Sequence, residues 1–179
     1  MHSQIRPTGV ERTFGADEVI VTKTDPLGRI TYANDVFCRV SAYPESDLLG
    51  APHNVIRHPQ MPRGVFRLLW QTITERREIF AYVLNLAGDG AHYWVLAHVT
   101  PSIDTTGRVV GYHSNRRLPS ARAVSTLQPV YQRMLVAERA ESGAGAAAAA
   151  GLQVLEDELA ARGCTYDELV WSLTNGAAA

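Results

Sequence analysis

The chain has 179 residues, a length that fits one domain of ordinary size with an additional segment. Hydrophobic residues make up 46% of it and charged residues 20%, which is typical of a folded globular protein and excludes a disordered chain. A net charge of −1 gives no general attraction to nucleic acid or to an anionic membrane, so we expect no nucleic-acid partner.

The cysteines and the hydropathy indicate a cytoplasmic protein. Cys38 and Cys164 lie far apart without a CxxC motif, so we expect two free thiols in a reducing compartment. The N-terminal residues lack the apolar core of a signal peptide. No segment approaches about 18 to 20 consecutive apolar residues, so we expect no insertion into a membrane.

Strand and turn signals begin after residues 1–17, a polar N-terminal arm that we expect to be flexible or to cap the fold. Residues 19–33 predict a β-hairpin, because two β-branched runs flank the turn residues TDPLG. Asn34 or Asp35 predicts the N-cap of the short helix DVFCRVS. Gly50 then predicts the left-handed end of a second helical turn.

The segment 52–66 reads PHNVIRHPQMPRGVF and contains too many prolines for a regular helix or strand. We expect irregular backbone there, followed by a helix with Pro62 in its first turn. The apolar face of this helix is predicted to comprise Val65, Phe66, Leu69, Trp70 and Ile73. The hairpin turns AGDG and DTTG predict three further strands at residues 79–86, 91–103 and 108–117.

This order of elements predicts an α+β fold, in which residues 18–118 form a five-stranded antiparallel sheet with short helices on one face. Residues 119–179 predict a C-terminal helical extension, with capping-box patterns at Ser125–Gln128 and Thr165–Glu168. The Ala- and Gly-rich segment 142–151 predicts a flexible joint, with an alanine-rich helix as the alternative. The extension carries so much apolar surface that we expect it to pack on its own sheet, a second copy or a partner.

Motifs for catalysis and for metal binding are absent from the sequence. Six histidines occur, but no HExxH motif, His/Cys quartet or carboxylate pattern joins them, and we expect no metal site. There is no GxSxG, GxGxxG or P-loop motif, so we expect no catalytic residues and no enzyme activity. A haem ligand requires a single histidine, which leaves a haem site at His53 or His58 open.

Polar and aromatic residues around the proline-rich segment suggest a cofactor pocket. Arg57 and His58 flank a helix N-terminus, where backbone N–H groups and the helix dipole favour an anion. Trp70 offers a flat surface for an aromatic ring, and the amides of Asn34 and Asn85 could hydrogen-bond a heterocycle. Together these groups describe a dinucleotide such as a flavin. Taken alone, Trp70 fits a core residue better than a cofactor contact, and Asn34 fits a helix cap better.

Three stretches between about residues 19 and 131 carry a family pattern: YANDVFCRVSAYPESDLLGAPHNVIRHPQMPRGVFRLLW, DGAHYWVLAHVTP and GRVVGYHSNR. PHN, RHP and MP followed by HYWV form a specific combination. In these motifs the chain resembles the flavin-binding PAS domains of bacterial aerotaxis receptors. The resemblance implies a PAS fold and a non-covalently bound FAD.

The resemblance also implies seven cofactor-binding residues: Asn34, His53, Arg57, His58, Trp70, Asn85 and Tyr93. Trp70 would stack near the isoalloxazine ring, and Asn85 would hydrogen-bond that ring. Arg57 and His58, with His53, would hold the pyrophosphate and adenosine side.

Asn34 would assist from the opposite wall of the pocket, and Tyr93 would belong to the signalling strand beside it. Four positions depart from the family pattern: Gln60 replaces an acid, Phe80 replaces a common tryptophan, and Leu86 and Ala87 stand where basic residues are frequent. These departures bear on the affinity and orientation of the cofactor rather than on the fold.

The resemblance further implies a redox, oxygen or energy sensor rather than an enzyme. A change in the flavin would let the Asn85 amide exchange its donor and acceptor ends, which reorganises the sheet and the helices packed on it. We expect output by contact with a methyl-accepting chemotaxis-type transducer or another signalling protein, and a homodimer is equally compatible. Two alternatives stay open: a ligand-free PAS module for protein interaction or dimerisation, and a haem-binding PAS gas sensor.

Overall fold

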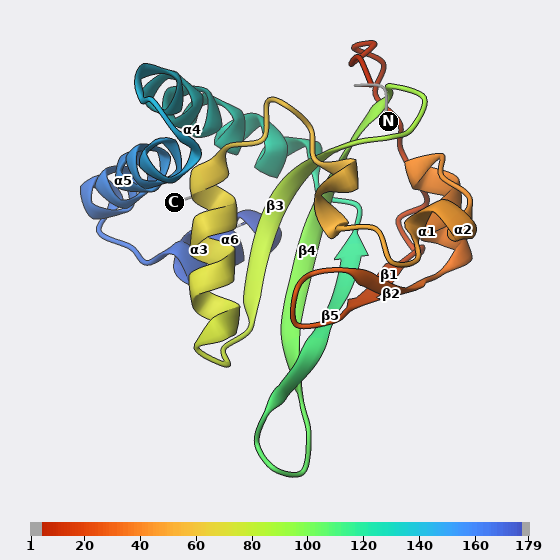
Figure 1. The fold of residues 1–179 in the computed structure, drawn as a ribbon. Helices are drawn as coiled ribbons and strands as arrows, with labels where there is room; N and C mark the ends of the chain where they lie inside the picture. The colour runs from red at the N-terminus through yellow and green to blue at the C-terminus, as the bar shows by residue number, and fades with distance from the viewer. Residues whose placement is uncertain (1–4, 177–179) are drawn as a thin grey trace.

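The computed structural model describes residues 5–176, which form a five-stranded antiparallel sheet flanked by helices (Figure 1). The strands are β1 Ile20–Thr24, β2 Ile30–Ala33, β3 Ile79–Leu86, β4 His92–Ile103 and β5 Val109–Arg117. Their order across the sheet is β2-β1-β5-β4-β3, so β5 joins the β1–β2 hairpin to the β3–β4 hairpin at the centre. The predicted α+β fold is confirmed.

Short helices cover one face of this sheet. They are α1 Asp35–Ser41, α2 Glu45–Leu48, the 3-10 helix η1 His53–Ile56 and α3 Arg63–Thr74. Helix α1 begins as predicted after Asn34, whose side chain accepts the backbone N–H of Phe37 at 3.1 Å. Gly50 follows α2 with a φ of 78°, a conformation that glycine adopts at little cost.

The tight turns of two hairpins are held by aspartates. One carboxylate oxygen of Asp25, between β1 and β2, accepts the backbone N–H groups two and four residues further along the chain. Asp104 does the same between β4 and β5. These turns set the register of the strands, and the observed limits of β3, β4 and β5 lie within one residue of the predicted ones.

The described part of the C-terminal extension forms three helices, α4 Ala121–Ala140, α5 Ala144–Arg162 and α6 Tyr166–Thr174. The predicted helix start at Ser125–Gln128 is wrong, because Ser120 accepts the backbone N–H of Ala123 and starts α4 earlier. Pro129 lies inside this helix. The segment 142–151 leads into α5 and forms its first half, so it is not a flexible joint. No helix within residues 5–176 is both long and apolar enough to cross a membrane.

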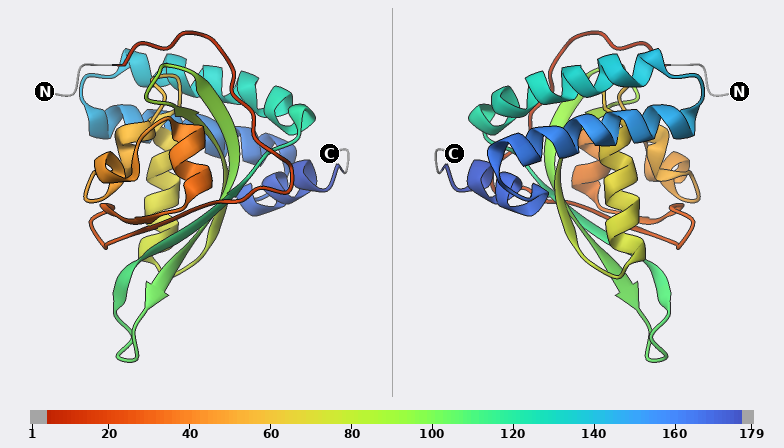
Figure 2. Two further views of the ribbon diagram at one scale, coloured as in Figure 1. Left: turned by 90° about the vertical axis from the view of Figure 1, so that its right-hand side faces the viewer. Right: turned by 90° about the vertical axis from the view of Figure 1, so that its left-hand side faces the viewer.

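The extension shares one hydrophobic core with the sheet. Tyr131 of α4 donates its hydroxyl to the backbone carbonyl of Tyr82 on β3 at 2.7 Å, and the Tyr82 hydroxyl lies 3.0 Å from Oγ1 of Thr174 on α6. Helix α5 packs against both α3 and α4 (Figure 2). The extension therefore wraps around β3, an edge strand that could otherwise pair with another chain.

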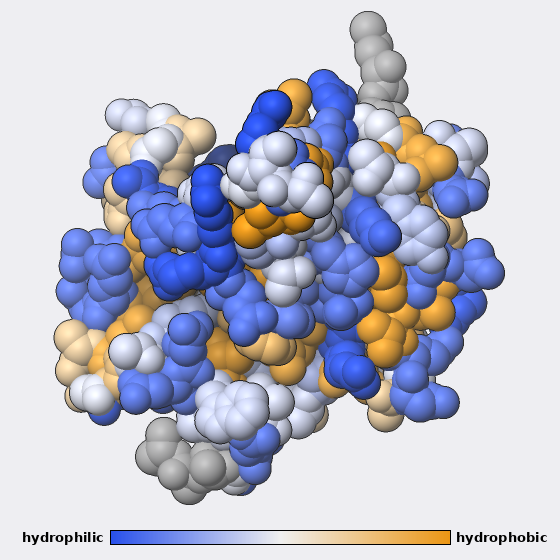
Figure 3. All heavy atoms as spheres, turned by 90° about the horizontal axis from the view of Figure 1, so that it is seen from below, coloured by the Kyte–Doolittle hydropathy of each residue, from blue (hydrophilic) through white to orange (hydrophobic). Residues whose placement is uncertain are grey.

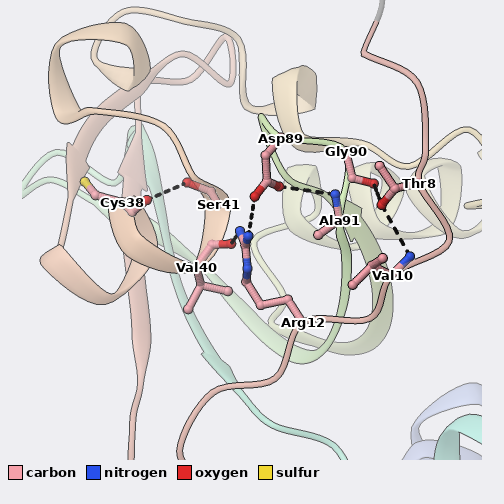
Figure 4. A network of polar contacts seen from close by, with 9 residues as sticks. All are labelled: Thr8, Val10, Arg12, Cys38, Val40, Ser41, Asp89, Gly90 and Ala91. Carbon is pink, nitrogen blue, oxygen red and sulfur yellow. Dashed lines mark hydrogen bonds and ion pairs between the residues drawn. The ribbon is translucent and has the colours of Figure 1, made fainter.

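The N-terminal arm lies beside the start of β4. Arg12 donates its backbone N–H to the carbonyl of His92 at 2.7 Å. Its guanidinium donates to the carbonyl of Val40 at the end of α1, at 2.9 Å, and forms an ion pair with Asp89 in the turn before β4 (Figure 4). The arm was expected either to be flexible or to cap the fold, and its described part caps the fold.

Candidate functional site

A cavity of about 270 Å³ lies between α3, η1 and the inner face of the sheet. Its helical wall is apolar and includes Phe66, Leu69, Trp70 and Ile73. Its sheet wall carries the polar side chains of Thr22, Asn85, Ser114 and Arg116. A concave space with mostly apolar walls and a few convergent polar groups is the usual form of a small-molecule site.

Arg116 brings a buried positive charge to the sheet wall. Its guanidinium donates to Oγ1 of Thr22 at 3.0 Å and to Nε2 of His53 at 2.7 Å, and both acceptors are neutral. Burial lowers the pKa of Arg116 to about 10, and burial together with the charge of Arg116 lowers the pKa of His53 to about 3. Because no carboxylate within residues 5–176 forms an ion pair with Arg116, the wall keeps a net positive charge.

Two neutral polar groups on the same wall lack partners. Asn85 on β3 is 3% exposed and Ser114 on β5 is 6% exposed. Neither Nδ2 of Asn85 nor Oγ of Ser114 has a hydrogen-bond partner among the described residues. An unpaired buried polar group costs about 1–3 kcal/mol, and such groups are rare in native proteins. The pair therefore marks the place where a ligand with hydrogen-bond acceptors would fit.

Arg57 closes the cavity from the proline-rich loop. Its backbone forms a β-bridge with Asn85 on the free edge of β3, and its guanidinium donates to the carbonyl of Met61 at 2.9 Å. The guanidinium also lies over the ring of Phe66, 4.8 Å from the ring centroid. Burial, followed by the charge of nearby Arg63, lowers the pKa of Arg57. These contacts hold the loop in shape and add a second cation to the cavity.

Four of the seven predicted cofactor-binding residues line the cavity: His53, Arg57, Trp70 and Asn85. Trp70 is 40% exposed, and its ring meets that of Tyr112 edge-on with the centroids 5.5 Å apart. Leu27, 81% exposed, also lines the cavity. Seen from below, the molecule shows apolar residues interspersed with hydrophilic ones (Figure 3). A flat ligand could therefore contact the ring of Trp70 from the cavity side while part of it reaches solvent.

The structure does not bring Asn34 to the cavity, because its amide oxygen and its amide nitrogen both bond backbone groups beside α1. Its Oδ1 accepts the N–H groups of Val21 at 3.0 Å and of Phe37 at 3.1 Å. Its Nδ2 donates to the carbonyl of Val19 at 2.8 Å. Asn34 lies outside the cavity lining and acts as the cap of α1.

His58 and Tyr93 also lie outside the cavity lining. Nδ1 of His58 accepts the backbone N–H of Gln60 at 3.1 Å, and its ring meets that of His92 edge-on with the centroids 6.0 Å apart. Tyr93 is fully buried on β4, and its hydroxyl has no partner in the described part of the chain. Burial raises the pKa of that hydroxyl. These two side chains adjoin the loop and the sheet rather than the cavity.

The residues that depart from the family pattern (Gln60, Phe80, Leu86 and Ala87) do not line the cavity. Phe80 and Leu86 alternate along β3 with the cavity residue Asn85, so they belong to the opposite face of the strand. Phe80 stacks there on His98, with ring centroids 4.1 Å apart. Gln60 is exposed and contributes only its backbone N–H, to His58. Substitution at these positions therefore leaves the cavity walls unchanged.

No role was predicted for Arg116 and Ser114, although both lie in the matched stretch GRVVGYHSNR and both line the cavity. A signal for them exists in the alternation of β5, because Tyr112, Ser114 and Arg116 share one face of the strand. An arginine at an inward position of a central strand is unusual for a core and typical of a binding site.

Two of the alternatives left open by the sequence fit this geometry poorly. A haem-bound His53 would need its Nε2, which lies 2.7 Å from a guanidinium nitrogen of Arg116. His58 lies outside the cavity lining. A ligand-free module would fill its pocket with side chains, whereas these walls enclose about 270 Å³. Within residues 5–176 no three His, Cys, Asp or Glu side chains are grouped as metal ligands.

Comparisons with known proteins agree with the geometry. A family model described as the PAS fold matches residues 18–114. The chain is 35% identical over 116 residues to the aerotaxis receptor of Escherichia coli (strain K12), and 32% identical over 99 residues to the nitrogen fixation regulatory protein of Klebsiella pneumoniae. These matches cover 65% and 55% of this chain, but only 23% and 20% of those proteins. The chain thus corresponds to less than a quarter of each relative.

Solved structures show the same fold. One, from work on the mechanism of a light-oxygen-voltage (LOV) domain with a flavin analogue, has a TM-score of 0.57 at 19% identity and covers 64% of this chain and 87% of that one. The light-state LOV domain of the photoreceptor Aureochrome1 has a TM-score of 0.55 at 25% identity and covers 64% and 91%. The resemblance predicted from the motifs is confirmed. With its strand order, its helices on one face of the sheet and the match over residues 18–114, the chain belongs to the PAS family.

Proposed function

We propose that this chain is a flavin-binding PAS sensor and that its flavin is FAD, held non-covalently in the cavity between α3 and the sheet. The observation that carries the proposal is the polar set on the sheet wall, where Asn85 and Ser114 lack partners and Arg116 lacks a counter-ion among residues 5–176. A bound flavin would supply reversible electron acceptance, with negative charge gathering at the ring edge that carries its carbonyl oxygens and nitrogens.

The chain's own residues provide what such a ring requires. Asn85 and Ser114 would donate hydrogen bonds to its edge, and Arg116 would set a positive charge beside it. Trp70 provides an aromatic surface at the cavity, and Arg57 supplies a second cation for a phosphate-bearing tail. The amide of Asn85 can also present its oxygen instead of its nitrogen, which gives the sheet two arrangements.

We further propose a sensory rather than a catalytic role, in the cytoplasm. The similarity to an aerotaxis receptor supports a redox, oxygen or energy signal that passes by contact to a chemotaxis-type transducer or another signalling protein. A homodimer is the proposed assembly, with the helices of the C-terminal extension as the contact surface.

Titration of the purified protein with FAD, FMN and riboflavin, followed by flavin fluorescence, tests the cofactor. FAD should bind most tightly, and Asn85→Leu should weaken binding about tenfold or more, because the ring edge loses a buried donor. Asn115→Leu is the matched control, since Asn115 lies on the other face of β5 and pairs with His113 at 3.0 Å. A protein that binds none of the three flavins would refute the proposal. Tighter binding of FMN would change the cofactor, and a Soret band would favour haem.

A further inference from the structure

Helix α3, the apolar wall of the cavity, is held at its N-terminus by the C-terminal extension. Pro62 precedes the helix and offers no side-chain cap. Instead the carboxylate of Glu138, 7% exposed on α4, accepts the backbone N–H of Arg63 at 2.9 Å and that of Gly64 at 2.8 Å. A carboxylate in this place satisfies two of the unpaired N–H groups of the helix and complements its dipole.

Helix α5 closes the same contact from a third side. A Cβ atom on Gly64 would lie 2.4 Å from the backbone nitrogen of Leu152, and a Cβ atom on Gly151 would lie 2.2 Å from a carboxylate oxygen of Glu138. Neither glycine can therefore carry a side chain without displacement of a neighbour. We call the contact of Glu138, Gly64 and Gly151 the three-helix junction.

The junction is connected to the cavity through one rigid element and one short loop. The residues of the helical wall of the cavity and those held by Glu138 belong to the same 12-residue helix, Arg63–Thr74, so a shift of one end moves the other. The loop before α3 is tied to the cavity by Arg57, which donates to the carbonyl of Met61 at 2.9 Å. Movement of the helical wall must therefore either strain the bonds to Glu138 or carry α4 and α5 with it.

We infer that Glu138 is a positioning residue that couples the state of the cavity to α5, so that Ala144–Arg162 responds when the ligand enters. The inference rests on the proposed function and adds the path by which the signal leaves the cavity. That route leaves the cavity along α3, crosses the three-helix junction and ends on the surface of α4 and α5. The coupling is reciprocal. If the bound ligand shifts the equilibrium between two states of α5 by some factor, then a switch of α5 between those states changes the affinity of the cavity for the ligand by the same factor.

Hydrogen–deuterium exchange of the full chain, with and without saturating FAD, tests this coupling. In the wild type, FAD should slow exchange in both α3 and α5. Glu138→Gln keeps the size of the side chain but loses its charge and one acceptor. In this variant FAD should still slow exchange in α3, while the FAD-induced slowing of exchange in α5 should fall about fivefold or more. Glu141→Gln is the matched control, because Glu141 is an exposed acid at the end of the same helix.

Gly151→Ala tests the junction from the side of α5, since its methyl group must push the Glu138 carboxylate aside. It should reduce the α5 response as Glu138→Gln does, and both variants should bind FAD about fivefold more weakly. If α5 responds to bound FAD as strongly in both variants as in the wild type, the inference is wrong and the proposed function stands. If the wild type binds no FAD, both are wrong.

Discussion

Two regions of this protein bury a charge, and they treat it in opposite ways. In the three-helix junction, both carboxylate oxygens of Glu138 accept backbone N–H groups. In the cavity, Arg116 is as deeply buried but donates only to the neutral acceptors Thr22 and His53. An uncompensated buried ion is costly, and proteins concentrate such groups at functional sites. The difference separates a contact that holds the fold together from one that can accept a further partner.

The largest effect of a single substitution should come from filling the junction. Gly64→Ala places a methyl group against the backbone of α5, and we expect it to lower the free energy of unfolding by about 3 kcal/mol or to prevent packing of α5. Gly145→Ala is the control, because no heavy atom lies within 4 Å of its added Cβ, and it should be neutral or slightly stabilising. Urea denaturation measures both. Equal effects of the two substitutions would show that the junction is loosely packed.

Acid should act on the cavity through His53. The pKa of His53 is lowered from 6.5 to about 3 in the folded state, so this residue takes up a proton on unfolding at any pH between these values. Stability that is fully present above pH 6.5 is therefore lost as the pH falls toward 3, at about 1.4 kcal/mol per pH unit. Urea denaturation across this window measures the slope. His53→Gln should flatten it by that amount, and an unchanged slope would mean that His53 is not held neutral.

Removal of the cation from the cavity should separate stability from binding. Arg116→Met replaces a buried, unpaired charge with an apolar side chain of similar length, and we expect the ligand-free protein to gain about 1–2 kcal/mol of stability. FAD affinity should fall about tenfold or more, because the positive charge beside the ring edge is lost. Thermal denaturation without ligand and fluorescence titration with FAD measure the two effects. A variant that is less stable and binds FAD normally would make Arg116 a structural residue.

The smallest effect should come from the helical wall. Trp70→Ala removes an aromatic surface that is already 40% exposed, so FAD affinity should fall about fivefold with little loss of stability. Trp70→Phe keeps a ring and should restore most of the affinity. Fluorescence titration of both variants gives the comparison. Wild-type affinity in Trp70→Ala would place the flavin away from this wall.

Local patterns predicted the sheet of this protein well. Turn residues such as Asp25 and Asp104 and the two-residue alternation of the strands act over short distances, so the hairpins could be predicted from sequence. The start of α4 could not, because two serines, Ser120 and Ser125, offer competing caps and only packing selects one of them.

The two buried charges were harder to foresee than the fold. Arg116 meets His53 and Thr22 only after β1, β5 and η1 come together. Glu138 reaches Gly64 across 74 residues of chain, and no motif carries information about such a contact. Family resemblance identified His53 and Arg57 in the proline-rich loop and Asn85 on β3, and all three line the cavity.

The arm beside β4 also determines how this fold carries tension. Arg12 joins three segments, since its backbone bonds to His92, its guanidinium reaches the carbonyl of Val40, and an ion pair ties it to Asp89. A pull on the N-terminal side of Arg12 would first load the bonds of Thr8 to Gly90 and of Val10 to His92, and only then the contacts of Arg12. Because all of these contacts join the arm to α1, to the turn before β4 and to the first residue of β4, the force would reach those segments first.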